Sequence, residues 1–147
     1  MTVDDLIANH RKIGIDSNVF IYLFEGKGPA ADAAALLVDA VEAGRLQAVF
    51  ATVGLTEILT RPASVGDGAL FERYVDEVRG LANLVLVALN EEVAIDAAWG
   101  RSGDRDLGDA VHVATAGATR ATAFVTNDRR VRPRAGIQIV VLDELVA

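Results

Sequence analysis

The chain has 147 residues, which is enough for one domain and short for two. A composition of 52% hydrophobic and 24% charged residues is typical of a globular protein and excludes a disordered chain. The absence of cysteine excludes disulfides and thiolate metal sites, and the net charge of −7 argues against an ordinary basic nucleic-acid-binding surface.

The first residues, "MTVDDLIANHRK", carry two acids and have no long apolar core, so they do not resemble a signal peptide. No uncharged apolar run approaches the roughly 20 residues that a membrane span needs. We therefore expect a soluble, cytoplasmic protein that does not enter a membrane.

Apolar runs and the residues that interrupt them predict strands alternating with helices. In the first half we expect a strand at 12–15, a helix at 18–25 capped by Ser17 or Asn18, a helix at 29–44, a strand at 47–51 and a threonine-capped helix at 52–62 that ends near Pro62. A helix at 69–81, a buried strand at 83–89 and a helix at 91–101 capped by Asn90 follow. The last elements are a helix at 109–120, a strand at 122–126, a turn or short helix at 127–132 and a strand at 137–142. This alternation predicts an α/β fold, a three-layer α/β/α sandwich with a central, mostly parallel sheet and a single domain over 1–147.

Two acids follow predicted strands, at the edge of the sheet where ligands of open α/β folds gather. Asp16 comes directly after "KIGI", and Asp128 comes two residues after "FVT". Neither is informative alone, because Asp is common at strand ends as a turn former or helix cap.

Two further acids lie in predicted helices and make the pattern more specific. Glu57 is in the middle of the apolar "GLTEILT", and buried carboxylates usually pair with a cation or coordinate a metal. Asp109 begins the nearly apolar "DAVHVATA", where the helix N-terminus could by itself stabilise its charge. Four acids that converge on one sheet edge suit Mg²⁺ or Mn²⁺.

Four stretches together resemble the PIN-domain ribonucleases, especially toxins of the VapC type. They are "IGIDSNVFIYLFE", "TEILTRP", "DLGDAVHVATA" and "AFVTNDRRV". The resemblance runs from about residue 13 to residue 142 and depends on the ordered set, because each motif alone is unspecific. It implies a catalytic site of four acids, Asp16, Glu57, Asp109 and Asp128, supported by Ser17, Asn18 and Thr126. Ser17 stands where the family usually has threonine.

The resemblance implies a Mg²⁺- or Mn²⁺-dependent endoribonuclease that hydrolyses phosphodiester bonds. Asp16, Asp109 and Asp128 would bind the metal, and Glu57 would bind or orient the attacking water. A divalent cation in such a site lowers the pKa of water and neutralises charge on the scissile phosphate. The resemblance further implies a small antitoxin protein that blocks the site, and a homodimer for which the apolar-rich helices at 18–43 are candidate contact surfaces.

Three other residues near these motifs have simpler interpretations. Asp106, three residues before Asp109, is expected to be a loop acid or a helix N-cap. His112 could face the same ligand as Asp109, but a hydrogen-bonded core histidine is the favoured interpretation. Trp99 lies in an apolar helical stripe and is expected in the core.

Arginines gather on both sides of the last two acids. Beside an acidic metal site they are candidates for RNA phosphate contacts, which position the nucleic acid without reading its bases. The candidates are Arg101, Arg105, Arg129 and Arg130. For each one, a salt-bridged turn or a solvated surface charge is the ordinary alternative.

Other functions fit the pattern less well. A haloacid-dehalogenase-like phosphatase needs a second Asp where this chain has Asn18, and a receiver-like signalling domain needs a lysine near the last strands, whereas the two lysines here are Lys12 and Lys27. A PIN-fold ribonuclease that processes RNA outside a toxin–antitoxin system, and a non-catalytic α/β interaction module, are the remaining alternatives.

Overall fold

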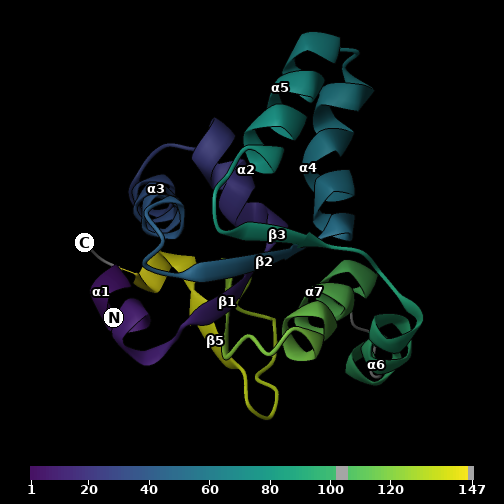
Figure 1. Cartoon of the computed structure of the whole chain (residues 1–147). Coiled ribbons are helices and arrows are strands. Elements are labelled where there is room, and N and C mark those ends of the chain that lie inside the picture. Colours follow the sequence, from purple (N-terminus) through teal and green to yellow (C-terminus); the bar gives the residue numbers. More distant parts are fainter. Residues whose placement is uncertain (102–105, 146–147) are drawn as a thin grey trace.

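A five-stranded sheet lies at the centre of the computed structural model, which describes residues 1–101 and 106–145 (Figure 1). The strands are β1 (Lys12–Ile15), β2 (Gln47–Ala51), β3 (Leu84–Val87), β4 (Ala123–Thr126) and β5 (Gln138–Val141). Their order across the sheet is β3-β2-β1-β4-β5, and every neighbouring pair is parallel. The carboxyl ends of all five strands therefore meet at one edge.

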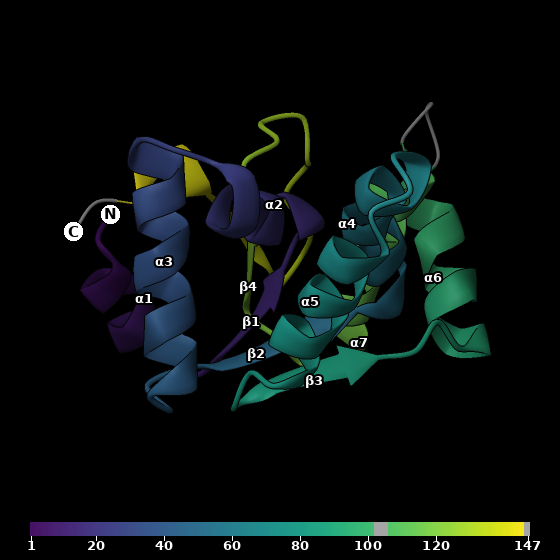
Figure 2. The ribbon, with the colours of Figure 1, turned by 90° about the horizontal axis from the view of Figure 1, so that it is seen from above.

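Helices cover both faces of the sheet. They are α1 (Val3–Asn9), α2 (Ser17–Glu25), α3 (Pro29–Glu42), α4 (Thr52–Ser64), α5 (Gly68–Arg79), α6 (Glu91–Arg101), α7 (Leu107–Ala118) and the short 3₁₀ helix η1 (Leu142–Glu144). Figure 2 shows α1, α3, α2 and α4 following one another along one face, and in Figure 1 α6 and α7 cover the other. The predicted α/β/α sandwich with a parallel sheet is confirmed. Along the described residues, no helix is both long and apolar enough to cross a membrane.

The alternation of side chains along the strands divides the core between the two helix layers. Ile13 and Ile15 of β1 are fully buried with the core cluster of α1 to α5, which includes the large ring of Phe20. Gly14 faces the opposite layer, where an added Cβ would come within 2.9 Å of the Ala116 Cβ on α7. This close approach brings the first turns of α7 beside the carboxyl end of β1.

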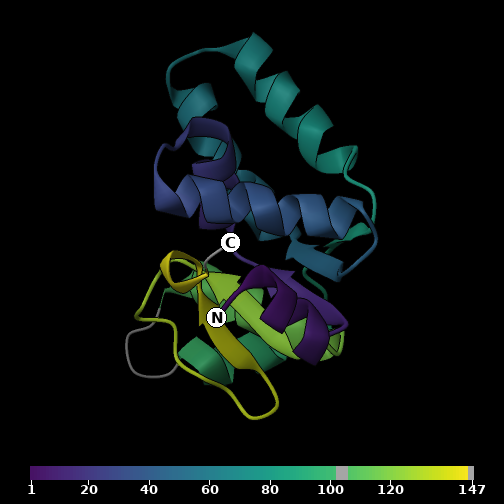
Figure 3. The same cartoon turned by 90° about the vertical axis from the view of Figure 1, so that its left-hand side faces the viewer.

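The α4–α5 pair lies at one end of the helix layer. Figure 3 shows it far from α1, with α3 between them. The threonine cap predicted for α4 is wrong, since Ala51 precedes the helix and contributes no side-chain cap. The helix also continues past Pro62 to Ser64, because proline lacks only its own N–H and the Val65 N–H still bonds the Arg61 carbonyl at 3.2 Å.

Two further details differ from the sequence expectation. The helix α1 was not predicted, although its capping box is visible in the sequence: the Thr2 hydroxyl accepts the Asp5 N–H, and the Asp5 carboxylate accepts the Thr2 N–H. The strand β3 is half-buried rather than buried, because it lies at the edge of the sheet and pairs only with β2. The predicted Asn90 cap is confirmed by its bond from the Val93 N–H, at 2.9 Å.

Candidate active site

Asp16 lies at the junction between β1 and α2, and its side chain is 4% exposed. It is itself the N-cap of α2, so the predicted caps Ser17 and Asn18 are wrong: the Asp16 Oδ1 accepts the Ser17 N–H at 2.7 Å, which leaves no need for a later cap. Thr126 at the end of β4 donates its hydroxyl to the other carboxylate oxygen, Oδ2, at 2.7 Å. These bonds hold a carboxylate in place at the centre of the sheet edge.

The three supporting residues named from the sequence all lie around Asp16. The hydroxyl of Ser17 and the amide of Asn18 are each 3.4 Å from an Asp16 oxygen. Asn18 also donates to the Thr126 hydroxyl oxygen at 3.2 Å, which links α2 to β4. Burial raises the pKa of the Asp16 carboxyl, and the neighbouring His112 and the Thr126 hydrogen bond only partly oppose this shift.

Glu57 and His112 meet Asp16 from the two helix layers. The His112 Nε2 lies 2.6 Å from the Glu57 Oε1 and 3.6 Å from the Asp16 Oδ1. One ligand-type atom from each of the three side chains lies within 4.8 Å of the others. Burial lowers the pKa of His112, but the Glu57 hydrogen bond and the charge of Asp16 outweigh it, so the pKa is raised.

His112 is the residue whose importance the sequence understated. The expectation of a buried, hydrogen-bonded histidine is confirmed, yet its partner is a site carboxylate and not a core backbone group. The signal was present in the sequence, because a residue three positions after Asp109 shares its helix face.

Asp109 lies in the first turn of α7, where it is half-buried. Burial raises its pKa to about 6, and the negative charges of Asp16, Asp106, Asp128 and Glu57 contribute to the same shift. Asp106 caps the helix by accepting the Asp109 N–H at 3.1 Å, as one of the two interpretations of this residue predicted. Asp109 is therefore a half-buried carboxyl group that lies within electrostatic reach of four other carboxylates.

Asp128 follows β4 and has a different environment. Its two carboxylate oxygens accept hydrogen bonds from the Arg130 Nε and Nη2, both at 3.0 Å, and Oδ1 also accepts the Arg130 N–H. The Arg130 guanidinium lowers the pKa of the Asp128 carboxyl. The salt-bridged turn considered for this segment is what the structure contains.

Comparison with known proteins now identifies the fold family. Residues 13–137 match the PIN domain. The chain belongs to the PIN domain family. A comparison with curated proteins finds no match.

Several solved structures resemble this PIN domain. A chain of a toxin-antitoxin complex from Klebsiella pneumoniae is 18% identical, with a TM-score of 0.64 and coverage of 91% of this chain and 99% of that chain. A chain of VapBC2 from Rickettsia felis, bound to a promoter DNA fragment, is 12% identical, with a TM-score of 0.68 and coverage of 88% and 98%. A chain of FitAcB from Neisseria gonorrhoeae is 16% identical, with a TM-score of 0.68 and coverage of 90% and 99%. At these identities the likeness shows a shared fold.

The four acids of this PIN domain are not equivalent in space. Asp16 and Glu57 form the compact cluster with His112, whereas Asp109 and Asp128 are near enough to interact electrostatically but lie outside that cluster. A donor set of carboxylate oxygens suits a hard divalent cation such as Mg²⁺ or Mn²⁺. The raised pKa of Asp109 reflects its burial first and the neighbouring negative charges second, and a divalent cation would offset both effects, so the residues fit such an ion.

The candidate RNA contacts of the PIN domain lie in different settings. Arg129 pairs with Glu144 at 2.7 Å, and Arg130 pairs with Asp128. Arg101 is exposed at the last turn of α6, and Arg105 lies outside the described residues. The role of these arginines toward RNA stays a prediction.

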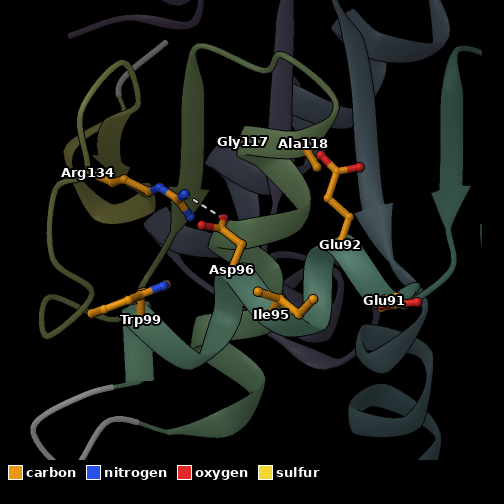
Figure 4. A pocket seen from close by; sticks show the side chains of 8 residues that line it. All are labelled: Glu91, Glu92, Ile95, Asp96, Trp99, Gly117, Ala118 and Arg134. Carbon is orange, nitrogen blue, oxygen red and sulfur yellow. Dashed lines mark ion pairs between the residues drawn. The ribbon is translucent and has the colours of Figure 1, made fainter.

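A hollow of about 770 Å³ lies beside α6, and its lining includes none of the four candidate catalytic acids (Figure 4). Its lining includes Trp99, Arg134 and Asp96, and Arg134 forms an ion pair with Asp96. The expectation that Trp99 lies in the core is wrong, since it is 79% exposed. The reason is that α6 buries only a narrow face, Val93 and Ala97, and Trp99 lies outside it.

Proposed function

We propose that this PIN domain is a divalent-metal-dependent endoribonuclease and the toxin of a toxin–antitoxin pair. The observation that carries the proposal is the cluster of carboxylates at the carboxyl edge of the parallel sheet, where Asp16 is buried and the pKa of Asp109 is raised to about 6. The toxin assignment is supported by similar structures that are described as a toxin-antitoxin complex, VapBC2 and FitAcB.

In the proposed reaction, Asp16 and Asp109 bind Mg²⁺ or Mn²⁺, and Asp128 binds it directly or through water. The bound ion would supply a Lewis acid that activates water and stabilises charge on the phosphate. Asp16 acts from a fixed position, because the Ser17 N–H and the Thr126 hydroxyl hold both of its oxygens. Glu57, whose side chain is 33% exposed, orients the attacking water.

Substrate binding requires positive charge near this acidic edge. Arg101, Arg105, Arg129 and Arg130 are the proposed contacts to the RNA backbone. Arg129 and Arg130 already pair with acids, but a guanidinium has five N–H donors, so each could contact a phosphate and keep its carboxylate partner.

The partners of the protein follow from the toxin assignment. A small antitoxin would block the acidic edge with a basic side chain until its removal releases RNA cleavage in the cytoplasm. A homodimer would form through the helices at 18–43, on which Ile21 is 37% and Leu36 is 41% exposed.

Cleavage of structured RNAs by the purified protein tests the enzymatic part of the proposal. We expect cleavage with Mg²⁺ or Mn²⁺, none with EDTA, and none by the Asp16→Asn variant. Cleavage that persists in EDTA or in this variant would contradict the assignment.

Growth of a host that expresses the protein tests the toxin part. We expect arrest by the wild-type protein and relief of the arrest by Asp109→Asn. RNA cleavage in vitro without any growth arrest would instead favour a PIN-fold ribonuclease that processes RNA outside a toxin–antitoxin system.

A further inference from the structure

The Glu57 carboxylate contacts α7 through both of its oxygens. Its Oε1 lies 2.6 Å from the His112 Nε2. Its Oε2 lies against Gly108, where an added Cβ would come within 2.9 Å of that oxygen. Gly108 and His112 are four residues apart and share one face of the helix. One turn of α7 therefore supplies both the room for this carboxylate and the hydrogen bond that fixes it.

Packing also fixes the imidazole of His112. Its ring packs near two phenylalanine rings, with centroid distances of 5.8 Å to Phe50 and 6.1 Å to Phe124. Gly54 closes a third side: an added Cβ there would lie 2.9 Å from the His112 Cε1 and 2.3 Å from two Phe50 ring atoms. The histidine can therefore act as a rigid hydrogen-bond donor.

Glu57 would have more freedom without these contacts. Its side chain is 33% exposed, and a glutamate that is not held loses its defined rotamer to solvent-facing alternatives. Residues that orient the groups around a metal affect affinity or activity by about 10–100-fold when they are replaced. The contacts of His112 and Gly108 with Glu57 would orient a group of the metal centre in this way.

We propose that His112 and Gly108 are positioning residues that hold the Glu57 carboxylate toward Asp16, where it would orient water at the metal centre on which the proposed function depends. His112 acts through Glu57. Its Nε2 already donates to the Glu57 Oε1, so it is not a metal ligand in this arrangement.

Binding of Mn²⁺ alone, measured by calorimetry at constant pH, tests this role without requiring RNA cleavage. We expect His112→Leu to weaken Mn²⁺ binding by about 10–100-fold. His112→Gln should restore affinity to within about threefold of the wild type, because its amide can donate from a similar position. The variant Gly108→Ala should also weaken binding, although alanine is the better helix former.

A double-mutant cycle separates positioning from direct ligation. In a Glu57→Gln background, the further change His112→Leu should have no additional effect, since the group that it positions is already altered. Additive losses would identify His112 as an independent ligand and overturn the proposal.

The matched control is His10→Leu, the same replacement at the other histidine of the chain. His10 bonds Thr122 and Gln138 instead of the acids, so Mn²⁺ affinity should not change. Thermal melting shows which variants fold. If His112→Leu does not fold, the Mn²⁺ affinity of Gly108→Ala tests the positioning role.

The results distinguish this inference from the proposed function. Wild-type Mn²⁺ affinity in both His112→Leu and Gly108→Ala overturns the inference, even if the protein cleaves RNA. The expected pattern of Mn²⁺ binding in a protein that cleaves no RNA supports the inference and overturns the proposed function. A wild-type protein that does not bind Mn²⁺ overturns both.

Discussion

Asp109 and Asp128 are two carboxylates at the same sheet edge with opposite electrostatic environments. Four carboxylates and burial raise the pKa of Asp109 to about 6, whereas Arg130 lowers the pKa of Asp128. The cation beside Asp128 is Arg130, which lies two positions later in the same turn. Most of the charges around Asp109 belong to segments that are distant in the sequence. The proposed cation would therefore depend mainly on Asp109 and Asp16, because Asp128 already pairs with Arg130.

Removal of each charge in turn is the strongest test of this difference. We expect Asp109→Asn to lower kcat/KM for RNA cleavage on the order of 10²–10³-fold, the range for loss of a main electrostatic group. Asp128→Asn should lower it by only about tenfold, because Arg130 already compensates that charge. Initial cleavage rates at saturating Mn²⁺ give the comparison, and equal losses in both variants would contradict it.

The rise in Tm on metal binding should depend on Asp109 and not on the Asp128–Arg130 pair. At a Mn²⁺ concentration 100 times the dissociation constant, binding adds about 2.7 kcal/mol, which raises the Tm of a chain of this length by roughly 5–10 °C. We expect this shift in the wild type and in Arg130→Ala, and little of it in Asp109→Asn. Melting curves with Mn²⁺ and with EDTA measure it, and a full shift in Asp109→Asn would argue against Asp109 as a ligand.

Without a bound metal ion, the charged Asp109 carboxylate should lower the free energy of unfolding. The pKa of Asp109 rises from an ordinary 3.8 to about 6 on folding, so between these pH values the folded chain keeps a proton that the unfolded chain releases. The free energy of unfolding therefore falls as the pH rises through this window and stays lowered above it.

The variant Asp109→Asn removes this cost. Because Asp109 is half-exposed, we expect a gain of only about 1 kcal/mol, or roughly 2–4 °C in Tm, at pH 7.5 in EDTA. The gain should disappear near pH 4. A gain that does not depend on pH would mean that the charge of Asp109 is not its cause.

The pair of Asp128 and Arg130 should matter least to stability. The Arg130 side chain is 89% exposed, and exposed ion pairs contribute little. We expect Arg130→Ala to change the Tm by less than about 2 °C at pH 7.5. Melting beside Arg132→Ala, a neighbouring arginine of the same segment, gives the control, and a loss above 5 °C would show that the turn stabilises the fold.

Much of the fold could be predicted from local patterns, and the errors have local causes. Apolar runs identified strands such as β4, which is buried on both faces, and Pro29 identified the start of α3. The same reasoning failed for Trp99, because an apolar stripe does not reveal how narrow the buried face of α6 is. It also missed α1, whose capping box was the available signal.

The sequence by itself determined the order of the elements and placed the four acids at strand ends and in helices, because periodicity and turn chemistry act over a few residues. It also contained the close pair Asp128 and Arg130, two positions apart. Only the tertiary structure decided that His112 would hold Glu57, 55 positions away, and that Thr126 would hold Asp16, 110 positions away. Such contacts depend on how α7 and β4 pack against β1, and no local pattern encodes that packing.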